Sequence, residues 1–182
     1  MGNQYDQLSS AGWLLRVTPM VSKYLLYVAP SLLVAALISF FSVRLLTAWF
    51  VRLPATLIHE ALHMLMGFFT FGGPVNFSFL PRRVGPGRWR LGSVGFRNLT
   101  WYNSALIALA PFLSLPLAAW IVWWRVQNGQ GIALADLGYW FLIGEMLIAA
   151  WPSPTDYHLA LKSWPIAIVA GAIYFVRVHG FW

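Results

Sequence analysis

Long apolar segments, separated by short polar ones, make up most of this chain. Five of them approach the ~20 residues that a helix needs to cross the hydrocarbon core of a bilayer. They are Tyr24–Ser42, Leu45–Phe69, Trp101–Trp124, Asp136–Trp151 and a weaker segment from about His158 to Val176. Tryptophan and tyrosine gather at several segment ends, as amphipathic rings do at membrane interfaces. The pattern predicts an all-α membrane protein, a polytopic bundle of about five transmembrane helices.

The connection between the second and third segments has a different period. Hydrophobic and polar side chains alternate in two short runs, as they do in a half-buried strand. The runs are Val75–Phe79 and Trp89–Ser93, with the turn-rich segment Pro81–Gly87 between them. We therefore expect a small β-hairpin here. The alternative is an Arg-rich loop that lies on anionic lipid headgroups.

Composition supports the membrane interpretation. Hydrophobic residues make up 59% of the chain and charged residues only 9%, too few to cover a soluble globule with a polar surface. The net charge of +7 is spread around the apolar segments, which favours contact with anionic headgroups over nucleic-acid binding. Cysteine is absent, so a metal would have to rest on histidine and carboxylate ligands. With no polar linker, residues 1–182 are expected to form one domain.

Basic residues also predict the orientation. The connection from Arg82 to Arg97 is rich in arginine and free of acidic residues, which places it in the cytoplasm. Arg16 and Lys23 precede the first apolar segment, which is expected to be an uncleaved anchor, so the N-terminus is predicted to be cytoplasmic as well. The chain would then be a multi-pass protein of the cell membrane, with its second and fourth helices parallel.

The second apolar segment contains the motif H-E-x-x-H, formed by His59, Glu60 and His63. Residues four apart share one face of a helix, so both imidazoles can bind one Zn2+ while the glutamate acts on the water at the metal. The chain holds four histidines and only two glutamates, so a chance match is rare. The alternative is a set of polar residues packed between helices.

Two histidines leave a zinc ion short of a protein ligand. In a parallel arrangement of the second and fourth helices, Asp156 lies at about the depth of the two histidines. Pro152 and Pro154 would unwind the chain there and let the carboxylate turn toward the metal. We therefore expect Asp156 to be the third ligand, with an interfacial helix cap as the alternative. Glu145 is expected to lie too far out along an unbroken helix.

Glu145 has a different predicted partner. Counting in helical turns from Asp156 and from His59 places Glu145 and Arg52 on the faces that carry the metal ligands. Each charge is costly alone inside a membrane, so an Arg52–Glu145 pair would neutralise both and hold the two helices together. The alternative is that Arg52 lies at the outer interface and extends toward the headgroups.

The order of these features resembles the site-2 protease family of intramembrane zinc metalloproteases. The H-E-x-x-H helix is followed by an acid-free connection with strand-like segments, a helix containing A-P, and a Pro-rich approach to Asp156. The resemblance covers about residues 45–160. It implies that His59, His63 and Asp156 bind zinc and that Glu60 is the catalytic base. The chain would be a short form, with no room for the PDZ domain that many members carry.

The chemistry expected from these residues is hydrolysis of peptide bonds in membrane-embedded or membrane-associated protein substrates, near the cytoplasmic face. Zinc would polarise the scissile carbonyl, while Glu60 takes a proton from water and passes it to the leaving amine. Asn103 or Ser104, at the inner end of the third helix, is expected to donate to the developing oxyanion.

Two other functions stay open. One is a non-catalytic metal-binding adaptor or substrate-binding relative, which would have no use for the base at Glu60. The other is a metal transporter, which needs polar groups along a path through both halves of the membrane.

Overall fold

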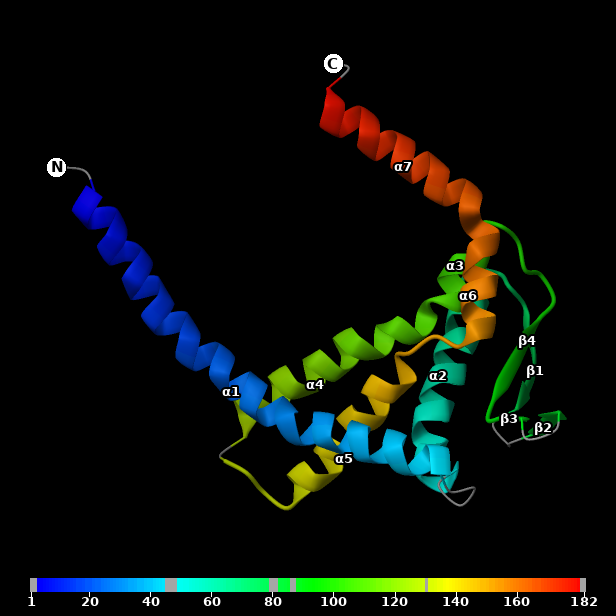
Figure 1. Ribbon diagram of the computed structural model, residues 1–182, viewed down its shortest axis with the longest axis horizontal. Helices are drawn as coiled ribbons and strands as arrows, with labels where there is room; N and C mark the ends of the chain where they lie inside the picture. The colour runs from blue at the N-terminus through cyan, green and yellow to red at the C-terminus, as the bar shows by residue number, and fades with distance from the viewer. Residues whose placement is uncertain (1–2, 45–48, 79–81, 86–87, 130, 181–182) are drawn as a thin grey trace.

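The computed structural model describes residues 3–44, 49–78, 82–85, 88–129 and 131–180. The protein is mostly helical, with a small antiparallel β element beside the helices (Figure 1). The helical elements are α1 (Asn3–Arg44), α2 (Trp49–Phe69), α3 (Ser104–Ala108), η2 (Ala110–Leu113), α4 (Ser114–Asn128), α5 (Ala135–Ala149), α6 (Pro154–Ala160), η3 (Leu161–Ser163) and α7 (Trp164–His179). The strands are β1 (Pro74–Ser78), β2 (Arg82–Gly85), β3 (Arg88–Arg90) and β4 (Ser93–Phe96). The predicted combination of helices with one β-hairpin after α2 is confirmed.

Helix α5 is central to the bundle and packs against α1, α2 and α4 (Figure 1). Its contact with α1 is close because residue 144 is glycine, where a Cβ would lie 3.1 Å from the Ser31 carbonyl oxygen. On the other side, α5 and α4 share a small buried apolar core. The core consists of Ala118, Val122, Ile143 and Met146.

Helices α2 and α5 run in the same direction. Ala55 contacts Glu145, and one turn further along both helices His59 contacts Ala149. The predicted parallel arrangement of these two helices is therefore confirmed, and it brings the end of α5 to the level of the H-E-x-x-H motif.

The third predicted span, Trp101–Trp124, is not one helix. It consists of the short helix α3, the 3-10 turn η2 and the longer helix α4. Pro111 explains the break because it has no N–H to donate to the Ile107 carbonyl, and its ring obstructs a regular helix before it. The prediction included this proline as the A-P of one continuous helix and missed the break that it causes.

The strands form one long, irregular hairpin. β1 pairs with β4, and β2 pairs with β3, so that Pro74 lies opposite Phe96 and Arg82 lies opposite Arg90. Register shifts interrupt both pairings. Two details of the predicted hairpin are corrected. Residues 82–85 of the expected connector Pro81–Gly87 form β2, and the expected second run, Trp89–Ser93, is divided between β3 and β4. Phe79, predicted at the end of the first run, lies outside the described residues.

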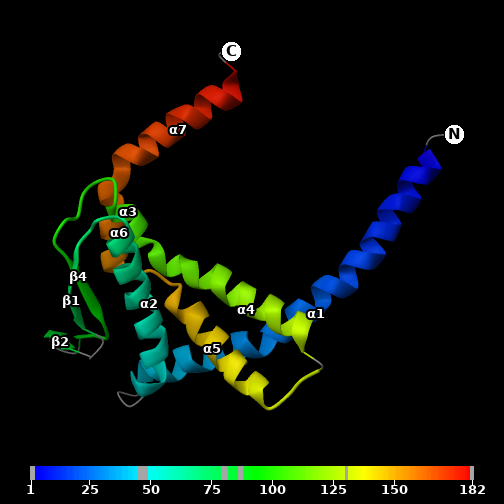
Figure 2. The same ribbon diagram turned by 180° about the vertical axis from the view of Figure 1, so that it is seen from behind.

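The hairpin folds back along α2 (Figures 1 and 2). The Phe96 ring occupies the space where a Cβ on Gly67 would stand, near the end of α2. Gly92 lies against Glu60 and Thr56, about two turns closer to the start of the helix. The arginine-rich end formed by β2 and β3 therefore lies toward the N-terminal end of α2, a position that periodicity alone did not predict.

Among the described residues, the segment Val21–Phe41 of α1 is long and apolar enough to cross a bilayer. It matches the first predicted span, Tyr24–Ser42. A second crossing is counted only if Pro154–Ile166 and Ile168–His179, bent by 53° to one another, are taken together. α5 has 15 residues, or about 22 Å, which is shorter than the ~30 Å hydrocarbon core. By length and hydropathy, the described helices thus provide one clear span.

A buried ionic cluster joins α1, α4 and α5 at the end of the bundle away from the hairpin. Asp136 is fully buried and accepts hydrogen bonds from Tyr27 Oη at 2.5 Å, Arg125 Nη2 at 2.7 Å and the Ala133 N–H at 2.6 Å. Both carboxylate oxygens have partners, so the cluster serves to hold the three helices. The sequence analysis noted Asp136 only as the start of a span.

Candidate metal centre

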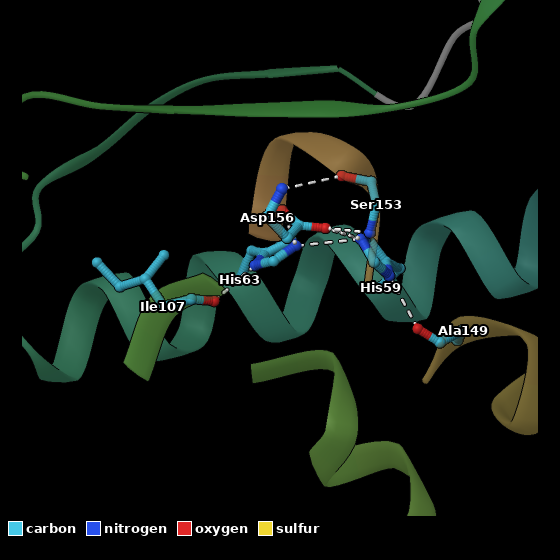
Figure 3. Close-up of polar contacts among 6 residues, drawn as sticks. All are labelled: His59, His63, Ile107, Ala149, Ser153 and Asp156. Atoms are coloured by element: carbon cyan, nitrogen blue, oxygen red, sulfur yellow. Dashed lines mark hydrogen bonds and ion pairs between the residues drawn. The ribbon is translucent and has the colours of Figure 1, made fainter. Parts of the chain in front are cut away.

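The ligand atoms of three side chains converge between α2 and α6 (Figure 3). His59 and His63 lie on one face of α2, with their Nε2 atoms 3.1 Å apart. Asp156 faces both of them: its Oδ2 is 3.4 Å from His59 Nε2, and its Oδ1 is 3.2 Å from His63 Nε2. The three residues predicted as metal ligands are thus brought together, with their ligand atoms within 4.8 Å of one another.

Backbone carbonyls orient both imidazoles. His59 Nδ1 lies 2.8 Å from the Ala149 oxygen, and His63 Nδ1 lies 2.7 Å from the Ile107 oxygen (Figure 3). A carbonyl can only accept, so each Nδ1 carries the proton and each neutral ring presents a bare Nε2 lone pair. Such contacts select the tautomer and the ring orientation that a metal requires.

Breaks in two helices leave these two carbonyls without their helical donors. The N–H that would bond to the Ile107 carbonyl in a continuous helix belongs to residue 111, which is proline. Helix α5 ends at Ala149, three residues before Pro152, and the Ser153 N–H donates instead to Asp156. Each imidazole therefore binds a carbonyl at a place where the sequence interrupts a helix.

Asp156 is held by the first turn of α6. The Ser153 N–H donates to Asp156 Oδ2 at 2.6 Å, and the Asp156 N–H donates to Ser153 Oγ at 3.3 Å. This reciprocal capping box means that the helix-cap and ligand roles, alternatives in the sequence analysis, occur in the same side chain. Ser153 was not among the predicted site residues. The spacing Ser-x-x-Asp after Pro152 would have indicated it.

The spacing of the donor atoms fits a metal ion. A tetrahedral site with bonds of ~2.0–2.1 Å holds its ligand atoms about 3.3 Å apart. Here the two imidazole Nε2 atoms are 3.1 Å apart, and they lie 3.4 and 3.2 Å from the two different oxygens of Asp156. Neutral imidazole and carboxylate are donors that divalent transition metals accept, and three protein ligands leave one position for water or substrate. His59, His63 and Asp156 can therefore hold a metal ion.

Glu60 lies beside this cluster in a groove of about 1120 Å³. The groove is bounded by α2, by α6 and by residues 90–96 of the hairpin. Glu60 is 9% exposed, and a Cβ on Gly92 would lie 2.8 Å from its Oε1, so the hairpin backbone passes directly over the carboxylate. A chain lying in the groove would meet the metal ligands, a carboxylate and a strand.

Glu145 does not form the predicted ion pair with Arg52. Among the described residues the ion pairs involve Asp156 and Asp136, whereas Glu145 Oε2 accepts the Ala55 N–H at 2.8 Å. That N–H is accessible because it follows Pro54, where the regular helical hydrogen bonding of α2 is disturbed. Arg52 lines the groove instead. Glu145 is fully buried, and its hydrogen bond to Ala55 attaches α5 to α2 about one turn before His59.

Asn103 and Ser104 do not reach the groove. Asn103 Oδ1 accepts the Thr100 N–H at 2.8 Å, while its Nδ2 donates to the Asn98 and Thr70 carbonyls. Ser104 Oγ donates to the Thr100 carbonyl at 2.6 Å. Both side chains are fully buried and organise the turn before α3, so the expected oxyanion role finds no support.

In comparisons with known proteins, no protein-family model, curated protein or solved structure matches this chain. The functional argument therefore depends on the geometry and chemistry of the site.

Proposed function

We propose that this chain is an intramembrane zinc metalloprotease, as its resemblance to the site-2 protease family implies. One observation carries the proposal: two histidines and an aspartate bring their ligand atoms within 4.8 Å of one another beside Glu60 in an open groove. Two histidines and a carboxylate with a fourth position open are a ligand set of catalytic zinc. A site that only stored a metal would need neither an open groove nor a carboxylate such as Glu60, which is not one of the three ligands.

Glu60 has the position of a general base and acid. Zinc, when bound, would polarise the scissile carbonyl and lower the pKa of the attacking water. Glu60 accepts one proton from that water while the water oxygen forms a bond to the carbonyl carbon. The carboxyl group then donates this proton to the nitrogen as the C–N bond breaks, which releases the amine. The Nδ1 contacts of His59 and His63 hold both rings in place throughout.

The hairpin gives a reason why the substrate would be an extended chain. A helix keeps its carbonyls in internal hydrogen bonds, so a transmembrane segment must unwind before it is cut. β4 lines the groove with residues 93–96 and pairs with β1, so a substrate segment lying along it could add to the strand edge. The proposed substrates are membrane-embedded or membrane-associated proteins.

Exposed apolar side chains support a membrane location. Leu26 on α1 is 74% exposed and Phe50 on α2 is 70% exposed, and large hydrophobic residues are exposed on α4 and α7 as well. We infer a multi-pass arrangement in which α1, α2, α3 with α4, and α5 cross the bilayer and the hairpin re-enters it beside α2. Arg16 and Lys23, near the start of the apolar segment of α1, then place the N-terminus in the cytoplasm, with the base of the hairpin on the same side.

The function is tested by cleavage of an extended protein by the purified full-length chain. Zinc-loaded protein in lipid nanodiscs should cut fluorescein-labelled β-casein, and 1,10-phenanthroline should stop the reaction because it removes the metal. Adding zinc back after the chelator is diluted out should restore the rate. Cleavage that persists in the chelator, or none by zinc-loaded protein, would contradict the proposal.

The orientation is tested by thiol labelling in intact cells, which is straightforward because the chain has no cysteine. We expect Asn128→Cys, at the exposed end of α4, to react with an impermeant maleimide added outside. Arg97→Cys, at the base of the hairpin, should react only after the membrane is permeabilised. The reverse pattern would invert the orientation.

A further inference from the structure

Three basic side chains line the same groove as the metal centre. They are Arg52 on α2, Arg90 at the end of β3 and Lys162 in η3, which we call the groove cations. The acidic residues that line the groove are Glu60 and Asp156, which have roles in proton transfer and metal binding. The basic side chains of the groove therefore outnumber its acidic ones, and the groove cations have no part in metal binding or proton transfer.

Among the described residues, Glu145 and Glu60 interact electrostatically with Arg52 and Arg90, respectively, but neither forms an ion pair with them. The chain has five acidic residues in all. Of those whose side chains are described, Asp136 pairs with Arg125, Glu145 is buried against α2, and the other two form the site. Within the described part of the chain, no ion pair involves a groove cation. A partner that enters the groove is thus the natural source of negative charge.

Arg52 and Lys162 flank the metal centre. Arg52 precedes His59 by seven residues of α2, which is about 10 Å along the helix axis. Lys162 lies on the side of His63, because its neighbour Ser163 accepts the N–H of Ala105 in α3, the helix whose Ile107 carbonyl binds His63. The two headgroup layers of a bilayer are separated by a hydrocarbon core of ~30 Å, whereas these cations flank the metal centre within one groove.

We propose that the groove selects extended peptide segments with acidic side chains on both sides of the scissile bond. The inference rests on the proposed function and specifies its substrate class. A strand advances about 3.3 Å per residue, so the ~10 Å to Arg52 corresponds to an acidic residue about three positions from the scissile bond. Carboxylates there would pair with guanidinium and ammonium groups that form no ion pair within the part of the chain that the structure describes.

The test uses quenched fluorescent peptides built around a bond that the protein cuts in β-casein. Three versions carry Glu, Gln or Lys three residues before and after that bond, and single-sided versions separate the two positions. We expect kcat/KM to be about fivefold higher for Glu than for Gln at each position, and lower still for Lys. High salt should reduce the preference. Binding of labelled casein-derived peptides with the same Glu, Gln and Lys series to zinc-loaded Glu60→Gln is measured in parallel.

Variants assign the preference to individual cations. Arg52→Gln should remove the preference for Glu on one side of the bond, and Lys162→Gln should remove it on the other. Arg177→Gln is the matched control, because Arg177 is exposed on α7 away from the groove. It should retain both preferences.

Equal cleavage and equal binding of the Glu, Gln and Lys peptides by the unmodified protein would overturn the inference while leaving the proposed protease in place. If no peptide is cut but the Glu peptide binds best and Arg52→Gln abolishes that preference, acid selection stands and the hydrolytic function fails. A third outcome would also overturn the inference. If Arg52→Gln and Lys162→Gln no longer bind phosphatidylglycerol-containing vesicles and the unmodified protein shows no peptide preference, the groove cations bind lipid headgroups.

Discussion

Glu60→Gln is expected to lower peptide hydrolysis by about 10²–10⁴-fold while the protein stays folded and keeps its metal. The amide has nearly the shape of the carboxylate and fits under Gly92, but it cannot accept the proton of the attacking water. Glu60 is also not one of the three side chains whose ligand atoms converge, so metal content should be unchanged. The measurements are kcat/KM on a fluorogenic peptide and zinc per protein by mass spectrometry.

The chain offers a matched control in its other glutamate. Glu145→Gln makes the same chemical change in the same bundle, and the amide oxygen can still accept the Ala55 N–H. Hydrolysis by this variant should stay within a few-fold of the unmodified protein. Full activity of Glu60→Gln would exclude the base mechanism, and loss of zinc from that variant would assign Glu60 to metal binding.

Asp156→Ala is expected to weaken zinc binding by more than about 100-fold and to abolish activity. Replacing a residue that merely supports a ligand already costs 10–100-fold in affinity, so removal of a ligand should cost more. The two imidazoles remain oriented by their carbonyls, but two ligands hold zinc poorly. Affinity is measured by competition with a zinc-selective fluorescent chelator.

Ser153→Ala separates the ligand role of Asp156 from its capping role. This variant removes the hydroxyl that accepts the Asp156 N–H, but it keeps both the carboxylate and the Ser153 backbone N–H. It should cost about 1 kcal/mol of stability, as the loss of a helix cap does, with a much smaller effect on zinc affinity. Equal zinc affinities for Asp156→Ala and the unmodified protein would mean that Asp156 is a cap alone.

The metal ligands could be predicted because their geometry is mostly local. His59 and His63 meet through the four-residue spacing of a single helix. Asp156 needed one further step, the parallel arrangement of α2 and α5, which followed from alternation of helices across a membrane. Pro152 and Pro154 then indicated where the chain would turn back toward α2.

Errors arose where hydrogen bonds between elements replaced regular geometry. Counting residues from Asp156 to Glu145 as one helix ignored the break between α5, which ends at Ala149, and α6, which begins at Pro154. Glu145 then meets a backbone N–H rather than Arg52, and no charge pattern predicts that contact. The oxyanion role predicted for Asn103 finds no support for a similar reason, because its Nδ2 donates to the nearby carbonyls of Thr70 and Asn98.

The two interrupted helices also bear on how this site tolerates change over evolution. The groups that orient the imidazoles belong to the main chain at Ile107 and Ala149, so those two side chains can vary without affecting the ligands. The constraint falls on Pro111, which has no N–H to compete for the Ile107 carbonyl, and on Asp156, whose Oδ2 accepts the Ser153 N–H that would bond to the Ala149 carbonyl in a continuous helix. Divergent members of the same lineage should therefore be sought by Pro111 together with the histidines and the aspartate.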